Sequence, residues 1–350
     1  MTTRSFPASK PRQGLLPTPL QIQAAQKTFK LLAGVAIAAF ACFGATAQAQ
    51  EFPTRAVRIT TPFPAGAGPE AVVRLVAEKL QKKWGKPVIV ENKPGANGFI
   101  AIDQFKRAPQ DGHELIQLDN VHLVAYPYLF KKLPYDPVKD FDQIVPLFRT
   151  YFFVTVPTNS KYKSVGDIVA DAKAHPGGLN YGSWSIGNPV HLGSALLETM
   201  TNTQMQHVIY KETSQLYAAV ATSELNFALG SMATAGPLQR GGRIKFLAVT
   251  APKRQAAFAD VPTVAESGGP AGYEVSGWTT IAAPKGLPKP VLDKIQKDID
   301  EALADPDIKA RYATFGYDVF PTTREQFNAF IASESTKYAD VIKRAKVALD

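Results

Sequence analysis

Two segments of this chain each place a glycine-containing loop between a strand-like run and a helix. The first loop, Pro62–Gly68 (PFPAGAG), follows the run Val57–Thr61 and precedes a helix that we expect to start near Pro69. The second runs from Asn180 to Pro189 and leads into a helix that carries His191. A helix N-terminus presents unpaired N–H groups and a partial positive charge, which suits a small anion. Two such turns facing each other across a cleft would form a clamp for a carboxylate.

The first fifty residues have the pattern of a secretory signal peptide. Lys27 and Lys30 precede the apolar run Leu31–Phe43, and an Ala-x-Ala pattern follows it. This run of 13 residues is too short for a transmembrane helix, which needs about 20. We predict that residues 1–49 are a signal peptide, cleaved after Ala47 or Ala49, and that the mature protein is exported.

The composition excludes several classes of function. Cys42 is the single cysteine and leaves with the predicted signal peptide, so cysteine-based redox and metal sites are excluded from the mature chain. Removing five basic residues with the signal peptide lowers the formal net charge from +9 to +4, and no Lys/Arg block indicates a nucleic-acid partner. The five histidines lack metal-ligand spacing, and Gly66-Ala67-Gly68 lacks the third glycine of a dinucleotide fingerprint. We therefore predict no metal and no cofactor.

Short β runs alternate with amphipathic helical patterns along the mature chain. This alternation predicts an α/β protein with mostly parallel sheets covered by helices. We expect two lobes, residues 51–150 plus 272–350 and residues 151–271, so that the chain crosses between the lobes twice and forms a hinge. Expected strands are 57–61, 88–90, 115–118, 152–156, 207–210, 225–229 and 244–249, and expected helices include 70–84, 290–304 and 324–345.

An ordered series of motifs resembles one known family. The motifs include PFPAG at 62–66, VENKPGANG at 90–98, KLPYDPVKDF at 132–141 and DVPTVAESG at 260–268. In this order the chain is similar, from about residue 51 to 348, to the Bug receptors, the periplasmic solute-binding proteins of tripartite tricarboxylate transporters. The resemblance implies a periplasmic location, a two-lobed periplasmic-binding-protein type II fold (a Venus flytrap), no cofactor and a small carboxylate ligand.

The resemblance also implies that backbone N–H and hydroxyl groups of the two loops hold the ligand carboxylate. The first loop departs from the family pattern at Gly66-Ala67-Gly68-Pro69-Glu70 and the second at Gly187-Asn188-Pro189-Val190-His191. We expect Gly68 and Asn188 to be the N-caps of the two helices and Glu70 to point away from the pocket. The predicted ligand-binding residues are Phe63, Ala65, Gly66, Ala67, Gly68, Asn120, His122, Ser183, Trp184, Gly187, Asn188, His191 and Gly230.

Several of these residues have two interpretations. His191 either hydrogen-bonds loop backbone or contacts the ligand. Trp184 either forms an aromatic wall with Phe99, Phe152 and Phe153, which would suit an aromatic or larger acid, or packs under its loop. Gly230 stands where many family members have an acid, so its lack of a side chain argues against an amino-acid ligand and leaves extra space.

The expected function is capture of a small organic carboxylate by lobe closure, followed by docking of the monomeric receptor on a transporter of the tripartite tricarboxylate type. A sensory receptor for a membrane signalling partner is the second version. A periplasmic hydrolase that uses Ser183 and His191 is the rival from another class, although the Gly-x-Ser-x-Gly elbow is missing.

Overall fold

The computed structural model describes residues 52–349. The predicted signal peptide lies outside these residues. Among the residues described, no helix is both long and apolar enough to cross a membrane.

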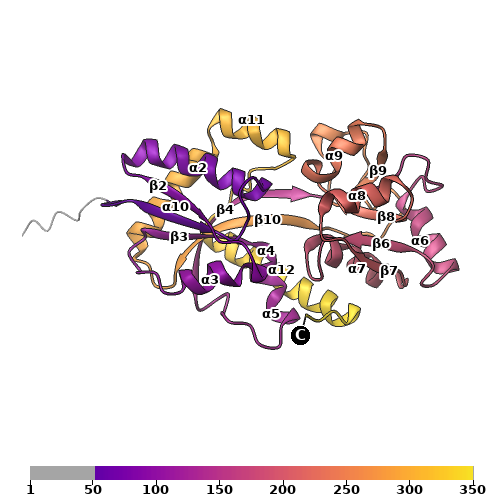
Figure 1. Cartoon of the computed structure of the whole chain (residues 1–350), viewed down its shortest axis with the longest axis horizontal. Coiled ribbons are helices and arrows are strands. Elements are labelled where there is room, and N and C mark those ends of the chain that lie inside the picture. Colours follow the sequence, from indigo (N-terminus) through magenta and orange to yellow (C-terminus); the bar gives the residue numbers. More distant parts are fainter. Residues whose placement is uncertain (1–51, 350) are drawn as a thin grey trace, which may run out of the picture. The chain divides into compact units, whose positions relative to one another are not determined.

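The first sheet has the strand order β2-β1-β3-β10-β4 and is drawn at the left of Figure 1. Its strand β1 pairs in parallel with β2 and β3, whereas β10 is antiparallel to β3 and β4. Its strands are β1 (Val57–Thr61), β2 (Val88–Asn92), β3 (Glu114–Asp119), β4 (Phe141–Tyr151) and β10 (Ser276–Pro284), and its helices are α2 (Gly68–Trp84), α3 (Phe99–Phe105), α4 (Asn120–Val124), α5 (Tyr126–Leu129), α10 (Lys289–Leu303), α11 (Pro306–Phe315) and α12 (Arg324–Ala345).

The second sheet repeats this plan with the order β7-β6-β8-β5-β9. Strand β6 is parallel to β7 and β8, and β5 is antiparallel to β8 and β9. Its strands are β5 (Phe153–Pro157), β6 (Asn180–Ser183), β7 (Gln206–Ile209), β8 (Phe227–Gly230) and β9 (Ile244–Val249), and its helices are α6 (Val165–Ala174), α7 (Pro189–Thr201), α8 (Thr213–Ala221) and α9 (Met232–Arg240). Short 3₁₀ turns at Ala96–Gly98 and Ala256–Phe258 complete the elements.

In each sheet the fourth strand in the order is antiparallel to the other four. These two reversed strands, β5 and β10, are the ones that follow the passages of the chain from one sheet to the other. The predicted two-lobed α/β class is therefore confirmed. The lobe boundaries proposed at 150/151 and 271/272 stay a prediction.

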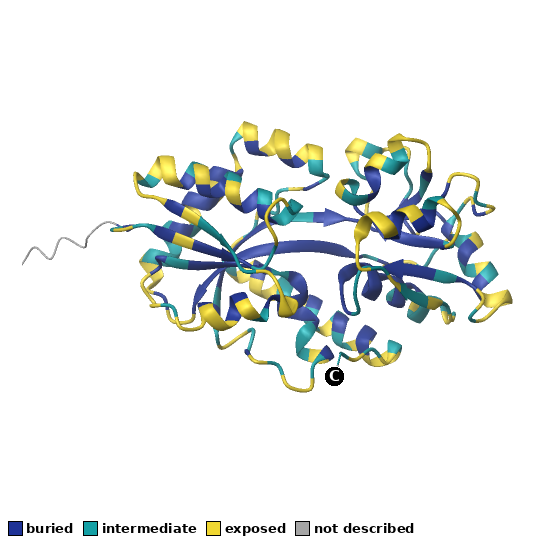
Figure 2. Ribbon diagram, viewed as in Figure 1, coloured by how far each residue is buried: buried dark blue, intermediate teal, exposed yellow. Residues whose placement is uncertain are grey.

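Helices cover both faces of the first sheet, because successive strand residues point to opposite sides. Leu115 packs with α2 and α10, whereas its neighbour Ile116 packs with α3, α4 and α12. The four-residue spacing of Val72, Val76 and Leu80 puts all three on one face of α2, where each is fully buried. Burial of such a side chain contributes about 1.5–3 kcal/mol. Figure 2 shows the resulting buried strands beneath helices whose outer faces are exposed.

Candidate functional site

The two predicted loops lie at the carboxyl edges of the two sheets, where open α/β sheets place their ligands. The first loop follows β1, and the second follows β6. Contacts cross between these edges. A Cβ at Gly187 of the second loop would lie 2.5 Å from Leu129 of α5, and one at Gly316, after α11, would lie 2.8 Å from Met232 of α9. Leu192 of α7 also belongs to the apolar cluster of α4, α5 and α12.

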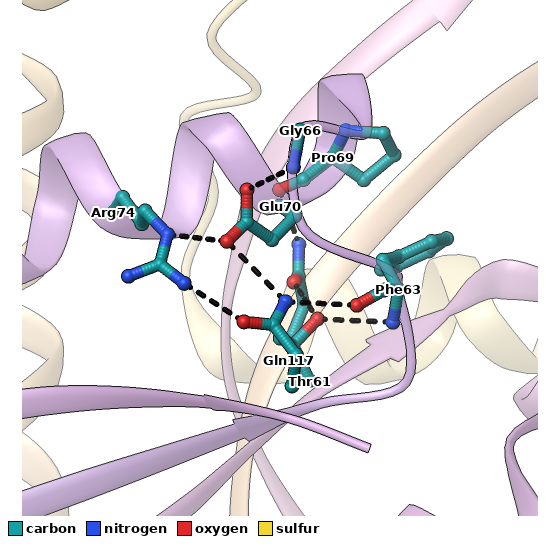
Figure 3. A network of polar contacts seen from close by, with 8 residues as sticks. Thr61, Phe63, Gly66, Pro69, Glu70, Arg74 and Gln117 are labelled. Carbon is teal, nitrogen blue, oxygen red and sulfur yellow. Dashed lines mark hydrogen bonds and ion pairs between the residues drawn. The ribbon is translucent and has the colours of Figure 1, made fainter. Parts of the chain in front are cut away.

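A network of polar side chains under the first loop fixes its shape (Figure 3). Gln117 of β3 accepts a hydrogen bond from the Thr61 hydroxyl at 2.7 Å and donates one to the Pro69 carbonyl at 2.9 Å. Asn92 donates to the Phe63 carbonyl at 2.9 Å, and the Phe63 amide donates to Thr61 Oγ1. Phe63 is thus held by its backbone and is half-buried.

Glu70 is the centre of this network. Its carboxylate accepts hydrogen bonds from the Gly66 amide at 3.1 Å, from Asn92 and from Arg74, and it is only 2% exposed. Burial by itself raises the pKa of Glu70, but these hydrogen bonds outweigh it and hold the pKa below its usual value. Glu70 therefore stabilises the loop from its buried side. The Gly66 N–H already donates to this carboxylate.

The helix after the first loop starts one residue earlier than predicted. Its N-cap is Ala67, with extended backbone angles, and Gly68 is the first helical residue, so the assignment of Gly68 as N-cap is wrong. Ala67 donates its amide to the Pro64 carbonyl. Within residues 52–349, the amides of Ala65 and Gly68 have no acceptor. These two N–H groups are the donors that the first loop can offer to an anion.

Asn188 is the N-cap of α7, as predicted. Its Oδ1 accepts the Val190 and His191 amides at 2.8 and 3.0 Å. Its amide group donates to Ser183 Oγ at 3.1 Å and to the Ser185 carbonyl. One side chain thereby caps the helix and holds the loop before it, which gives this loop a single shape.

His191 accepts the Gly187 amide at its Nδ1 atom, at 3.0 Å. Its ring stacks on His207 with centroids 4.0 Å apart. Burial, followed by the neighbouring His207, lowers the pKa of His191 to about 3, and burial lowers that of His207 to about 4. Both rings are neutral at neutral pH, and His191 has the role of a loop-shaping residue.

The geometry does not provide the serine–histidine pair of the hydrolase alternative. Ser183 Oγ lies 2.7 Å from His207 Nε2 and 2.9 Å from the Ser185 carbonyl, and it has no hydrogen bond with His191. In the described part of the chain, His207 has no carboxylate partner that could orient it. Ser183 is fully buried and is held as a hydrogen-bond hub.

At the end of β3, His122 and Asn120 are buried. His122 accepts the Asp119 amide at Nδ1 and contacts the Asn97 carbonyl through Nε2 at 3.0 Å, so both ring nitrogens are engaged. Burial lowers its pKa to about 4. Asn120 donates to the Ser276 carbonyl at 3.5 Å, and its Oδ1 has no partner.

Asp119 was missed by sequence reasoning. It is half-buried between β3 and α4, and burial raises its pKa to about 7. Burial, followed by the charge of Asp119, raises the pKa of both Tyr126 and Tyr317, which places Asp119 near the two phenols. Its position directly before Asn120, at the carboxyl end of a strand, is the signal that would have found it.

The aromatic wall predicted around Trp184 does not form as proposed. Trp184 packs in the cluster that contains Phe152, but Phe153 stacks on Phe246 and Phe99 packs against Tyr126 in the first sheet's layer. Trp184 is half-buried against the apolar clusters of the second sheet, which agrees with the packing interpretation.

Position 230 has no spare room. A Cβ at Gly230 would lie 2.6 Å from Ala235, 2.9 Å from Tyr217 and 3.1 Å from Thr155. The predicted extra space is therefore wrong, because α8 and α9 already fill it.

A cavity of about 350 Å³ lies between elements of the two sheets. Tyr317 lines it and also approaches the first loop, since a Cβ at Gly68 would lie 2.5 Å from the Tyr317 hydroxyl. Among the residues described, none of those predicted to bind ligand lines this cavity. Its wall is mainly aromatic and aliphatic, with Lys309 and Asp318 as charged members, and includes Tyr151, Phe153, Met232, Phe258, Tyr312 and Tyr317.

Comparison with known proteins agrees with this architecture. The family described as "Tripartite tricarboxylate transporter family receptor" matches residues 72–347. BugT of Bordetella pertussis (strain Tohama I) is 27% identical over 316 residues, which cover 90% of this chain and 97% of BugT. The solved structure of R. palustris Rpa4515 with adipate has a TM-score of 0.74 and 27% identity, and covers 85% of this chain and 99% of that one. MatC from Rhodopseudomonas palustris with bound malate has a TM-score of 0.71 and 27% identity, and the match covers 83% of this chain and 100% of MatC. This chain belongs to the family of tripartite tricarboxylate transporter receptors.

Proposed function

We propose that the protein is a periplasmic receptor that captures a small organic carboxylate between its two lobes and delivers it to a transporter of the tripartite tricarboxylate type. The observation that carries this proposal is a pair of strand–loop–helix turns, one at the carboxyl edge of each sheet, together with the contacts between helices and loops of the two sheets. Each turn ends at a helix N-terminus, and a partial positive charge there favours an anion by about 0.3–1 kcal/mol. The bound adipate of Rpa4515 and the bound malate of MatC support a carboxylate as ligand.

The donors that we assign to the carboxylate are backbone amides. The first loop offers the N–H groups of Ala65 and Gly68. In the second loop, the amides of Ser185 and Ile186 have no acceptor within residues 52–349. Charge-assisted hydrogen bonds contribute about 1.5–3 kcal/mol each. Three or four of them, after the costs of closure and immobilisation, suit a dissociation constant in the micromolar range or tighter.

The same geometry supports binding rather than catalysis. Gln117, Glu70, Asn188 and His191 are engaged in holding loop backbone. Ser183 is buried, and its hydroxyl is hydrogen-bonded within the loop network. A receptor needs rigid loops that present amides, and these side chains provide that rigidity.

Isothermal titration of the mature chain with adipate, malate and a panel of aliphatic and aromatic acids tests the proposal. We expect saturable binding of at least one acid, no binding of the corresponding diamide, and unchanged ligand when the mixture is analysed by NMR after incubation. Turnover of a bound acid, or the absence of binding across the panel, would overturn the proposal.

Export is the remaining part of the proposal. We expect the mature chain in the periplasmic fraction, with an N-terminus directly after Ala47 or Ala49 by mass spectrometry. A cytoplasmic protein that keeps its first fifty residues would contradict it.

A further inference from the structure

A second cavity lies in the layer of the first sheet, and no residue of either loop lines it. It has a volume of about 680 Å³ and lies over strand β4, between α4–α5 and α12. Its volume falls within the range of small-molecule sites, about 300–1,000 Å³. Most of the wall is apolar, with Leu123, Pro127, Val138, Phe141, Leu292 and Ile331 as members.

Gln143 of β4 is an unsatisfied polar group in this wall. The side chain is only 8% exposed, yet neither Nε2 nor Oε1 has a hydrogen-bond partner. A buried amide without hydrogen-bond partners is unfavourable, because it has lost its hydrogen bonds to water. The Gln143 side chain has one donor group and one acceptor, both without partners. An amide complements it, because an amide supplies one acceptor and one donor.

Arg324 supplies a second unsatisfied group to the same wall. Its Nη2 atom pairs with Asp293, but Nη1 is buried without a partner. The nearby carboxylates are already occupied, because Asp293 also pairs with Lys289, and Asp142 pairs with Lys285. Glu325 also interacts electrostatically with Arg324 and Lys289, so the charges of this group balance. Nη1 still lacks an acceptor, and a carboxylate oxygen forms the stronger, charge-assisted hydrogen bond with a guanidinium N–H.

From this juxtaposition we infer that the cavity is a second binding site, for an N-acylated apolar amino acid. The carboxylate accepts from Arg324 Nη1, the amide pairs with Gln143, and the apolar side chain packs against the aliphatic wall. Exposed Tyr128 and Val138, at 45% and 73%, mark the rim of the entrance. The site is independent of the two loops, so it goes beyond the proposed transport function.

Titration with N-acetyl-L-leucine tests this inference. We expect binding to the wild-type protein, and at least about tenfold weaker binding of N-acetyl-L-leucinamide, which lacks the carboxylate, and of 4-methylpentanoate, which lacks the amide. The variant Gln143→Leu should weaken N-acetyl-L-leucine binding by at least about tenfold while leaving the interlobe carboxylate affinity unchanged. Gln104→Leu, at an exposed glutamine of α3, is the matched control and should change neither affinity.

Thermal unfolding followed by circular dichroism shows whether Gln143→Leu folds. Ala332→Phe, which fills the cavity from an exposed position of α12, is a second variant with the same expected loss of binding. No binding of N-acetyl-L-leucine at millimolar concentration, which is the outcome if water alone fills the cavity, overturns the inference. So does unchanged affinity in both variants, or a loss of affinity in Asn188→Ala with none in Gln143→Leu, because the ligand would then sit at the loops.

Discussion

At the scale of single residues, both loops are held by side chains that hydrogen-bond backbone. Glu70 accepts the Gly66 amide in the first loop, and His191 accepts the Gly187 amide in the second. Gly66 and Gly187 have positive φ angles of 82° and 81°, which glycine adopts without steric cost. In both loops an acceptor four residues ahead satisfies the amide of a left-handed glycine.

Replacing Glu70 with Gln tests this role. We expect a loss of about 1–3 kcal/mol in the free energy of unfolding, because the neutral amide keeps only one acceptor for three donors. Urea denaturation measures the change. The matched control is Glu78→Gln on the same helix, whose ion pair with Lys82 is exposed and should contribute less than about 0.5 kcal/mol. Equal effects of the two substitutions would show that the Glu70 network does not support the loop.

His191→Gln tests the buried imidazole, since glutamine can still accept the Gly187 amide. The folded pKa of His191 is about 3, below its unfolded value of about 6.5. Between these values the unfolded chain binds a proton that the native protein does not, so the unfolding free energy falls as the pH falls. In the variant, the slope of unfolding free energy against pH should be shallower by up to about 1.4 kcal/mol per pH unit. Denaturation between about pH 4 and 6.5 measures both slopes. Identical slopes in the variant and the wild type would mean that a group other than His191 takes up the proton on unfolding.

Residue types alone could predict helix caps and turns, but not the hydrogen-bond partners of the loop residues. Asn188 before Pro189 has the sequence signature of a helix start, and the structure agrees. Glu70 accepts a hydrogen bond from Asn92 of β2, and Gln117 of β3 donates to the neighbouring Pro69 carbonyl, so both side chains come from strands far along the chain. Because such contacts are set by strand order, the sequence near Glu70 contains no sign of them.

At the scale of elements, the N-terminus of α7 is the feature most open to test. Asn188→Ala should cost about 1 kcal/mol of stability through the lost cap, and should also weaken carboxylate binding, because Ser183 and Ser185 lose their tether. Ser164→Ala at the N-cap of α6 is the matched control: it loses a comparable cap, and its effect should be on stability alone. Titration calorimetry and urea denaturation of both variants separate the two effects. Equal ligand affinities in the two variants would mean that the second loop does not contribute to ligand binding.

Gly230→Asp is expected to act on packing at the junction of β8, α8 and α9. The added side chain meets Ala235 and Tyr217, so the variant should lose at least about 2 kcal/mol of stability. Ala233→Asp, at an exposed position in the first turn of α9, is the control and should be nearly neutral. A Gly230→Asp protein of normal stability with weakened acid binding would place position 230 beside the ligand.

Strands with clear β patterns were predictable, and the two longest were not. The bounds 57–61, 244–249 and 324–345 agree with β1, β9 and α12. Strand β4, at the edge of the first sheet, contains Pro146, and β10 begins with Ser276-Gly277 close to a glycine-rich stretch, so neither has the usual sequence signature of a strand. Pairing between β4 and β10 over nine register positions overrides these local signals.

At the scale of the whole described chain, the two sheets share one topology, and helices and loops of the two sheets contact each other. Two passages of the chain connect them, which is the connectivity of a hinge. Helix α7 packs against α12, and Leu192 lies among Tyr338 and Ile342. The fold class could be predicted from alternation of elements, whereas the interlobe cavity depends on α11 and the Tyr317 segment, for which the sequence contains no ligand motif.

The most direct test of a carboxylate clamp is a crystal structure of the mature protein with its tightest-binding acid from the titration panel. The account predicts one carboxylate within hydrogen-bond distance of the Ala65 or Gly68 amide and of an amide in the 183–188 loop. An acid bound with its carboxylate in contact with neither loop would contradict it.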